Sequence, residues 1–587
     1  MPKEMESPID LQPVRFSMDR RRFIAATGTL VGGTALGVTT GAAPALAAKV
    51  ISGHKSFEHL NIGPNEVVVF NPNKDTTVHA HMVHVEGVLR MRPAKPGVKH
   101  RLIIGEGLHV EGGGRLDIVG TKKKAWTRAR SGLKSGQRRI KVTSVDGWRA
   151  GDRVVITPTG SPRNPSFDNA YDSGRIRRID RRRKIITLSS PLRRDHPRVN
   201  VGVMPGERKA RRYGAEVLNM SRNVQIDGSG DVHIHNTRRA KHRVNYATIS
   251  GLGVKDELGR YPLHFHTCRN NAAGSIVRGT VVENSANHGF VAHSSNRITF
   301  SDCIAHNIRD SAFWWDRLDE SGDKESNFVT YRRCVASDVD FDETPQAFKI
   351  MGFFLAAGRD RSNSCIGCVA VGIKGQDNAN GFGWDADAQS VWNFRDCLAH
   401  NNRRNGIWVW QNTSRIHRIS KTVCYHNGDV GIDHGSYSNN YHYDGIICHG
   451  NKNAQVLILA SSRGRQTFRN VLMDGTGLSE FAMIVSTGVP TPDAVDDNLF
   501  TTIENCVFRN YRRKGVQMTE AHENTQFGTM TRFRNCKWSG GEDSHFLVDD
   551  STKSPSRIRI IDSGRNLLMA KMGVFSKSKP EWNASIK

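Results

Sequence analysis

Short runs in which apolar and polar residues alternate recur through the chain at a nearly constant spacing. Seven of them begin at Leu263, Phe290, Phe313, Phe348, Phe382, Ile407 and Ile432, which are separated by 27, 23, 35, 34, 25 and 25 residues. A sustained period of this length is typical of solenoids, in which each repeat forms one coil. Because long amphipathic helical patterns are missing, the pattern predicts an all-β chain folded as a right-handed parallel β-helix.

Aligning the runs 263–266, 290–293 and 313–316 places His266, His293 and Asp316 in one column. Neighbours in a column of a parallel sheet lie about 4.8 Å apart. Because side chains alternate between the two faces of a strand, Leu263 is expected to point into the core, whereas His264 shares the outer face with His266. The alignment therefore predicts that two imidazoles and one carboxylate converge on the solvent side of the sheet.

This column supports two kinds of chemistry and one structural alternative. His266, His293 and Asp316 are suited to hold a divalent metal ion facially, with His264 as a fourth ligand. Without a metal, Asp316 would orient an imidazole that exchanges protons near neutral pH. The structural alternative is a polar ladder on an exposed face that has no chemical role. The sequence leaves all three open.

Further aromatic and acidic residues fall in the same outer columns. Asp385 and Trp410 continue the column of Asp316, and Trp314 and Trp408 belong to the neighbouring one. Exposed tryptophans on a rigid sheet bind sugar rings well, because the apolar face of a pyranose matches an aromatic plane. We therefore expect these tryptophans to bind substrate if nothing covers them.

Two ways of cutting a polysaccharide remain open. Hydrolysis commonly uses paired carboxylates about 5 to 9.5 Å apart, and Asp316 and Asp385, two coils apart, would be separated by about 9.6 Å. Elimination would instead use a histidine as base and a cation to neutralise a uronate, for which Arg260 is the candidate. The alternative role for Arg260 is a structural ion pair with Asp256 or Glu257.

The order of segments predicts an exported protein. Residues 1–47 contain Arg20-Arg21-Arg22-Phe23, a short apolar run and Ala45-Leu46-Ala47, the features of a twin-arginine signal peptide. The segments expected after it are a glycine-rich β domain at 48–120, a basic β-rich region at 121–215, the β-helix at 216–550 and a basic tail at 551–587. No later stretch is long enough for a membrane span. We expect a secreted or cell-envelope location.

The chain is strongly basic, with a formal net charge of +27. Paired and clustered Lys and Arg concentrate between Lys122 and Arg243. Such a surface attracts polyanions but says nothing about the fold. The two interpretations are a solvated face and the capture of an acidic polymer. Nucleic acid is not expected as a partner, because no aromatic stacking residues are interleaved with these arginines.

The ten cysteines favour a structural role in the thiol form. Most follow a strand-like run and precede the next bend, as in FSDCIAHN and FRDCLAHN. One cysteine per coil at a repeated position stacks into a buried ladder of small apolar thiols. The ladder predicted from this spacing comprises Cys303, Cys334, Cys368, Cys397, Cys424, Cys448, Cys506 and Cys536.

Residues 50–320 resemble a known family. The glycine-rich strands from Val50 to Ile118, the segment 145–156 and the motif GRYPLHFH at 259–266 are similar to the G8 domain and following β-helix of the cell-migration-inducing, hyaluronan-binding protein, its transmembrane relative and fibrocystin. The resemblance implies binding or cutting of hyaluronan or a similar polymer. It supports the location of the site but not its chemistry.

The function we expect is a secreted carbohydrate-active protein that binds and depolymerises an acidic, hyaluronan-like polysaccharide on the outer face of a β-helix. The enzyme would be a glycosidase or a lyase, with a divalent metal ion as the candidate cofactor. The alternative is a non-catalytic cell-envelope or adhesion protein that binds polyanions. The two differ in whether the length of the polymer changes.

Overall fold

The computed structural model describes residues 48–314, 326–341, 350–355, 358, 363–375, 379–384, 390–410, 415–435, 440–459, 466–487, 500–520, 530–540, 546–548 and 558–561. These residues form strands β1 (Ala48–Ile51) to β51 (Ile558–Ile561) and no α-helix. Within them, no segment qualifies as a helix able to cross a membrane. The predicted signal peptide, Asp316, Asp385 and most of the predicted tail lie outside the described residues.

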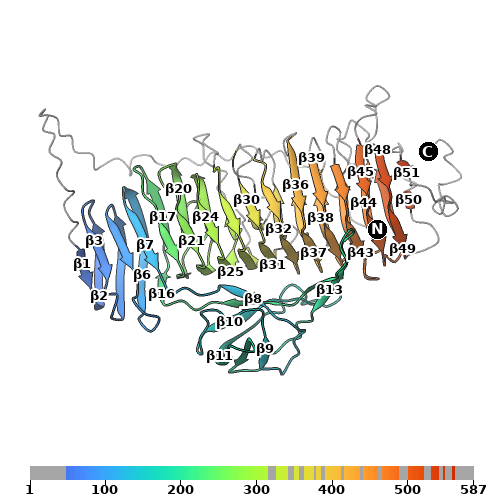
Figure 1. Cartoon of the computed structure of the whole chain (residues 1–587). Helices are drawn as coiled ribbons and strands as arrows, with labels where there is room; N and C mark the ends of the chain where they lie inside the picture. Colours follow the sequence, from blue (N-terminus) through green and yellow to red (C-terminus); the bar gives the residue numbers. More distant parts are fainter. Residues whose placement is uncertain are drawn as a thin grey trace, which may run out of the picture. The chain divides into compact units, whose positions relative to one another are not determined.

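Three ladders of parallel strands stack along one axis (Figure 1). The first sheet contains sixteen strands and runs from β1 to β51. The second sheet runs from β16 (Val224–Gly228) to β49 (Lys537–Ser539), and the third runs from β17 (Asp231–Asn236) to β50 (Phe546–Val548). Each coil contributes one strand to each sheet, and this confirms the parallel β-helix.

The β-helix begins earlier than expected. The long strands β2 (Gly53–Ile62), β4 (Thr76–Val85) and β6 (His100–Gly112) pair in parallel with one another, and the two halves of β6 pair with β16 and β17. The glycine-rich segment is therefore the first set of coils rather than a separate domain. The repeated alternation of the type Val-His-Val-Glu explains why these segments stack as coils, because the apolar residues of each repeat point into the same core.

Residues between β7 (Arg115–Val119) and β16 leave the β-helix and form an antiparallel sheet of six strands. The order of this sheet is β8 (Trp126–Arg128), β15 (Glu216–Asn219), β10 (Arg153–Ile156), β11 (Asp172–Asp180), β12 (Ile185–Leu188) and β9 (Arg139–Lys141). Its apolar residues Val155, Leu218 and Met220 share a buried cluster with outward side chains of the second sheet, such as Val335 and Leu398. The basic region therefore packs against the β-helix.

A buried ion pair ties this antiparallel sheet to the second sheet. Glu216 is fully buried, and its carboxylate accepts hydrogen bonds from Arg128 at 2.9 Å and from Nε2 of His400 at 3.1 Å. Although burial opposes ionisation, His400 and Arg128 hold the pKa of Glu216 below its ordinary value of 4.5. The charged form of Glu216 thus stabilises the contact.

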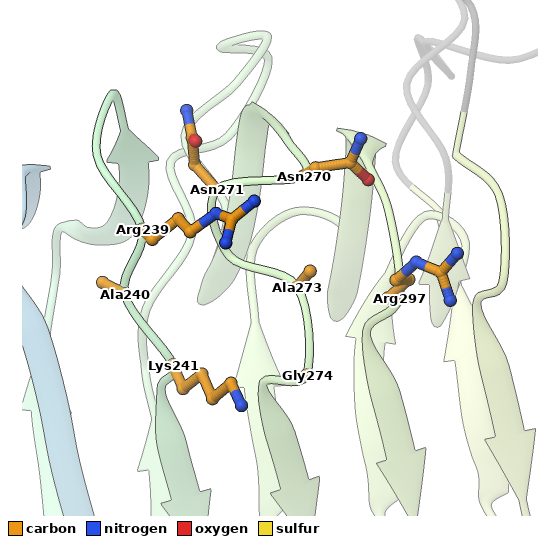
Figure 2. Close-up of a pocket in the computed structure, with 8 residues that line it drawn as sticks. All are labelled: Arg239, Ala240, Lys241, Asn270, Asn271, Ala273, Gly274 and Arg297. Carbon is orange, nitrogen blue, oxygen red and sulfur yellow. The ribbon is translucent and has the colours of Figure 1, made fainter.

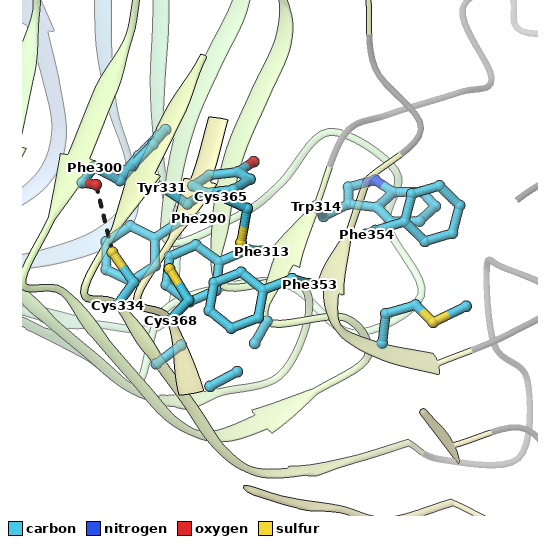
Figure 3. Packing of buried hydrophobic residues seen from close by; sticks show 14 of the residues in the cluster. Phe290, Phe300, Phe313, Trp314, Tyr331, Cys334, Phe353, Phe354, Cys365 and Cys368 are labelled. Carbon is cyan, nitrogen blue, oxygen red and sulfur yellow. Dashed lines mark hydrogen bonds between the residues drawn. The ribbon is translucent and has the colours of Figure 1, made fainter. Parts of the chain in front are cut away.

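The core is built from columns of like side chains. Leu263, Phe290 and Phe313 occupy one column, as predicted. Beyond them the column continues through Phe353, Phe382, Ile407 and Ile432. The rings of Phe313 and Phe353 stack with centroids 4.4 Å apart (Figure 3). Each ring thereby buries a whole face against the next coil.

The prediction that Phe348 begins the fourth run is wrong, because Phe353 takes its place. Strand β29 (Ile350–Phe354) starts two residues after Phe348. Phe353 changes the steps to Phe313 and Phe382 from 35 and 34 residues to 40 and 29, so regular spacing favours Phe348. The stacking of Phe353 between Phe313 and Phe382, with centroids 4.4 and 5.0 Å away, outweighs this regularity.

All ten cysteines are free thiols, and only Cys536 is not fully buried. In Figure 3, Sγ of Cys334 donates to the carbonyl of Phe300 at 3.4 Å. The predicted ladder has two columns rather than one, since Cys424 pairs with Cys448 but lies opposite Ala399, two residues beyond Cys397. Small apolar thiols fit either inward position.

We predict that Phe353→Ala destabilises the protein by about 3 to 5 kcal/mol, because the neighbouring rings cannot collapse into the cavity. Urea unfolding followed by circular dichroism measures this loss. Phe328→Ala is the control, because 43% of Phe328 is exposed, and a cost below about 1 kcal/mol is expected there. Equal costs for the two variants would contradict the stacked core.

We also predict that Glu216→Gln costs about 3 kcal/mol at neutral pH, because it leaves the partly buried guanidinium of Arg128 without its carboxylate partner. Since the folded-state pKa of Glu216 is depressed, its contribution is fully present above pH 4.5 and is lost as the pH falls below that value. Urea midpoints of the variant and the wild type should therefore converge in acid. Glu207→Gln, which breaks an exposed pair with Arg211, should change the midpoint little at any pH.

Candidate functional site

Histidines fill consecutive outward positions of the third sheet and of the strands that precede it. The first column consists of His84, His109, His233 and His264, which pair in register from β4 through β6 and β17 to β20 (Leu263–Arg269). The ring centroids of successive members are 6.1, 5.6 and 5.0 Å apart. Val291 and Trp314 continue this histidine column on the next two coils.

A second column lies two residues further along each strand. Glu111 is in register with His235, and His266 with His293 of β23 (Phe290–Ser295). The rings of His235 and His266 are 5.7 Å apart, and those of His266 and His293 are 4.9 Å apart. The predicted pairing of His266 with His293 is confirmed, whereas Asp316 lies outside the described residues.

Sequence reasoning missed four members of these columns, although a signal was present. The tetrapeptides VHVE at 83–86, LHVE at 108–111, VHIH at 232–235 and LHFH at 263–266 repeat one pattern with histidine at the second position. The regular spacing can be followed only from Leu263 onward, because the inserted antiparallel sheet interrupts it on the N-terminal side of that residue. The histidines that the spacing from Leu263 did not reveal are His84, His109, His233 and His235.

The prediction that this face is open to solvent is wrong for most of its residues. His264 and Val291 are fully buried, and His293 is 3% exposed. An aromatic layer packs on the column: the ring centroid of Tyr261 lies 4.8 Å from that of His264, and the ring of His288 stacks on Trp314 at 4.3 Å. His266 is only half-buried.

The tautomer of His264 follows from its hydrogen bond. Nδ1 lies 2.8 Å from the carbonyl oxygen of Gly259, which can only accept, so Nδ1 carries the proton. The lone pair is therefore on Nε2, a buried atom that has no hydrogen-bond partner within the described part of the chain. A buried acceptor without a partner is costly and calls for an explanation.

The surroundings keep two of these imidazoles neutral. Burial, reinforced by the neighbouring His233, His266 and His293, lowers the pKa of His264 well below its ordinary value. Burial, together with His266 and His109, lowers the pKa of His233 to about 3. Both side chains are therefore uncharged at neutral pH, the form that accepts a proton or binds a metal ion.

Three histidines approach one point. One ring nitrogen from each of His233, His264 and His266 lies within 4.8 Å of the other two. The ring centroids are 5.0 Å apart for His233 and His264, 4.7 Å for His233 and His266, and 4.8 Å for His264 and His266. This histidine cluster shares His266 with the predicted set of His266, His293 and Asp316, and it also contains His264, the predicted fourth ligand. His233 was not predicted.

Asp231 lies at the edge of the cluster and holds Arg260 in an ion pair. Its carboxylate is 3.2 Å from Nε of Arg260, 3.6 Å from Nε2 of His109 and 4.0 Å from Nδ1 of His233. Arg260 also contacts Glu257 at 3.3 Å. Burial opposes the charge of Arg260, but Asp231 raises its pKa above the ordinary value. Two roles were predicted for Arg260, neutralising a uronate and forming a structural ion pair, and the structure shows the ion pair.

The tryptophans lie in the expected columns but are not exposed platforms. Trp314 is in register with Val291, and Trp408 with Gly383. Both tryptophans are 2% exposed. Trp410 is half-buried, and its ring lies parallel to Trp408 at 5.7 Å. The prediction of exposed sugar platforms is therefore wrong for Trp314 and Trp408, because alternation along a strand does not reveal what covers its outer face.

A basic pocket of about 750 Å³ opens at the turns that follow β17, β20 and β23 (Figure 2). Three exposed cations line it: Arg239 and Lys241 lie in the turn after β17, and Arg297 lies in the turn after β23. Asn270 and Asn271 line it between them, and in Figure 2 the side chain of Arg239 extends toward Asn271. The basic pocket therefore follows directly, on the same coils, the strands that carry the histidine cluster.

Comparison with known proteins identifies relatives of this part of the chain. Residues 229–341 match the family described as CEMIP beta-helix. Human fibrocystin-L is 25% identical over 286 residues, which cover 40% of this chain and 6% of that protein. Protein rliB of Dictyostelium discoideum is 24% identical over 232 residues, which cover 38% of this chain and 19% of that protein. The chain thus spans only a small part of these curated relatives.

Two solved structures illustrate the structural comparison. The catalytic domain of a GH87 alpha-1,3-glucanase aligns with a TM-score of 0.34 and 10% identity, over 76% of this chain and 91% of that one. The A-module of the Azotobacter vinelandii mannuronan C-5 epimerase AlgE4 aligns with a TM-score of 0.29 and 14% identity, over 58% of this chain and 84% of that one.

The segment 229–341 that matches the family contains the strands β17, β20 and β23 that carry the histidines. This region of the chain belongs to the CEMIP beta-helix family.

Proposed function

We propose that this chain is an exported protein that binds an acidic, hyaluronan-like polysaccharide across the coils of β17, β20 and β23 and depolymerises it. The observation that carries the proposal is that the turns after β17, β20 and β23 form the basic pocket, while β17 and β20 themselves carry the histidine cluster. Fixed cations recognise the carboxylates of a uronate polymer, and neutral imidazoles on the same coils exchange protons with its glycosidic linkage. The membership of residues 229–341 in the CEMIP beta-helix family supports this location.

The cations that bind the polymer are those of the basic pocket rather than Arg260. Arg239, Lys241 and Arg297 are exposed, whereas Arg260 is already paired with Asp231 and Glu257. Electrostatic attraction by the rest of the basic surface brings the polymer to the protein, and the pocket sets its register on the coils.

Two reaction classes are compatible with these residues. In elimination, a base removes the proton next to the uronate carboxylate, the glycosidic C–O bond breaks, and the leaving oxygen takes up a proton, which leaves an unsaturated uronate. In hydrolysis, water adds its hydroxyl to the anomeric carbon and its proton to the leaving oxygen. His233 and His266 are the half-buried members of the cluster, and because the pKa of His233 is lowered to about 3, we assign His266 as the proton carrier.

A second candidate function is polymer binding without cleavage. The observation that favours it is the burial of His264 and His293, which removes two of the predicted proton carriers from contact with solvent. In that case the basic pocket would retain the polymer at unchanged length.

We predict that the protein shortens hyaluronan, chondroitin or polygalacturonate, as measured by gel filtration of the polymer after incubation. His266→Ala should lower the rate by about a hundredfold or more, the usual effect of removing a general acid or base. New ultraviolet absorbance would identify an unsaturated product and hence elimination. If none of these polymers is shortened while an acidic polymer is still retained, the protein is a binder and the enzymatic proposal fails.

We predict that Arg239→Ala/Lys241→Ala/Arg297→Ala raises the KM for the polymer several-fold and leaves kcat nearly unchanged, because these side chains bind substrate without touching the reacting bond. Arg177→Ala/Arg178→Ala/Arg182→Ala is the control, because it removes the same charge from exposed positions on the antiparallel sheet and its turn. Equal effects of the two triple variants would mean that overall charge, and not the basic pocket, determines binding.

A further inference from the structure

We propose that His233, His264 and His266 form a binding site for one divalent transition-metal ion of the zinc type. The proposal concerns metal binding alone, and it goes beyond the proposed function because it holds whether or not the polymer is cleaved. With an ion bound, His266 would be a ligand, and the proton transfer assigned to it would pass to water at the open position of the ion. The three ligands come from two neighbouring strands, with His233 on β17 and both His264 and His266 on β20.

The geometry fits an ion held by three nitrogens. Zinc binds histidine nitrogen at about 2.0 to 2.1 Å, so three ligands of a tetrahedral ion lie about 3.4 Å from one another. The nitrogens of the cluster lie within 4.8 Å of one another. Small rotations about the side-chain bonds, moving each nitrogen by on the order of 1 Å, close this difference. The fourth position remains open to water or substrate.

Two of the three ligands have a polar partner at the ring nitrogen that would not bind the metal ion. A ligating histidine usually donates its other ring N–H to a carbonyl or a carboxylate, which fixes the ring and leaves the opposite nitrogen free to bind. Nδ1 of His264 donates in this way to Gly259 at 2.8 Å. Nδ1 of His233 faces the carboxylate of Asp231 at 4.0 Å. At this distance the contact is electrostatic rather than a hydrogen bond, and on this contact we assign Asp231 as a positioning residue for the site.

The buried lone pair of His264 is the independent observation that indicates a ligand. Its Nε2 is shielded from solvent and accepts no hydrogen bond from the described residues. A simple stack of histidines would leave this atom unsatisfied, whereas a metal ion in the cluster satisfies it. Three imidazoles select zinc, cobalt, nickel or copper rather than calcium or magnesium, which require oxygen ligands.

The test is a metal titration of the full chain after treatment with a chelator. We expect one Zn²⁺ per chain, measured by competition with a chromophoric chelator, and a visible Co²⁺ spectrum typical of four-coordinate nitrogen ligation. His233→Gln and His264→Gln should each lower the affinity by at least about a hundredfold, and Asp231→Asn by about tenfold. Ca²⁺ in excess should not displace either ion.

The control is the double variant His54→Gln/His79→Gln, because these two rings also contact each other, with centroids 4.8 Å apart, but lie outside the cluster. It should bind zinc like the wild type. Thermal unfolding shows whether each variant is folded. If His264→Gln does not fold, His233→Gln decides the question, because the His233 side chain is partly exposed.

Equal loss of zinc binding in the control and cluster variants would overturn the proposal, and so would the absence of a tight site in the wild type. Because the readout is metal stoichiometry and the cobalt spectrum, these outcomes do not depend on polymer cleavage. A protein that binds zinc but cuts no polymer would refute the proposed function and leave the metal site intact.

Discussion

The stacking of equivalent residues on successive coils is the constraint on which the rest of this structure depends. Parallel pairing places the same position of each coil about 4.8 Å from its neighbours. Inside the helix this builds the column of Phe290, Phe313, Phe353 and Phe382. Outside the helix the same register brings histidines from strands far apart in sequence, such as His109 and His233, to within ring contact.

Periodicity predicted the fold and part of the candidate site. The parallel β-helix, the column of Leu263, Phe290 and Phe313, and the pairing of His266 with His293 all follow from alternation and spacing, because register errors of one residue would expose the core face. The start of the helix was missed because the inserted antiparallel sheet breaks the period. That break also hid His233, the ligand contributed by the preceding coil.

What covers an outer face could not be predicted from alternation. Tyr261 and His288 pack against the column of His264 and Trp314, and they come from turns whose path the strand pattern does not define. The burial that results makes His264 a neutral acceptor instead of a solvent-exposed acid or base. The exposed positive charge on the same coils belongs to Arg239 and Arg297 in the turns, neither of which the sequence pattern predicted as a site residue.

We propose that the coils of β17, β20 and β23 carry both the cations and the imidazoles that act on an acidic polysaccharide. A crystal structure of the protein with a short uronate-containing oligosaccharide tests it most directly. We expect the sugar to lie across these coils, with a carboxylate in the basic pocket of Arg239, Lys241 and Arg297 and a glycosidic linkage next to His266. An oligosaccharide bound instead to the basic antiparallel sheet would contradict it.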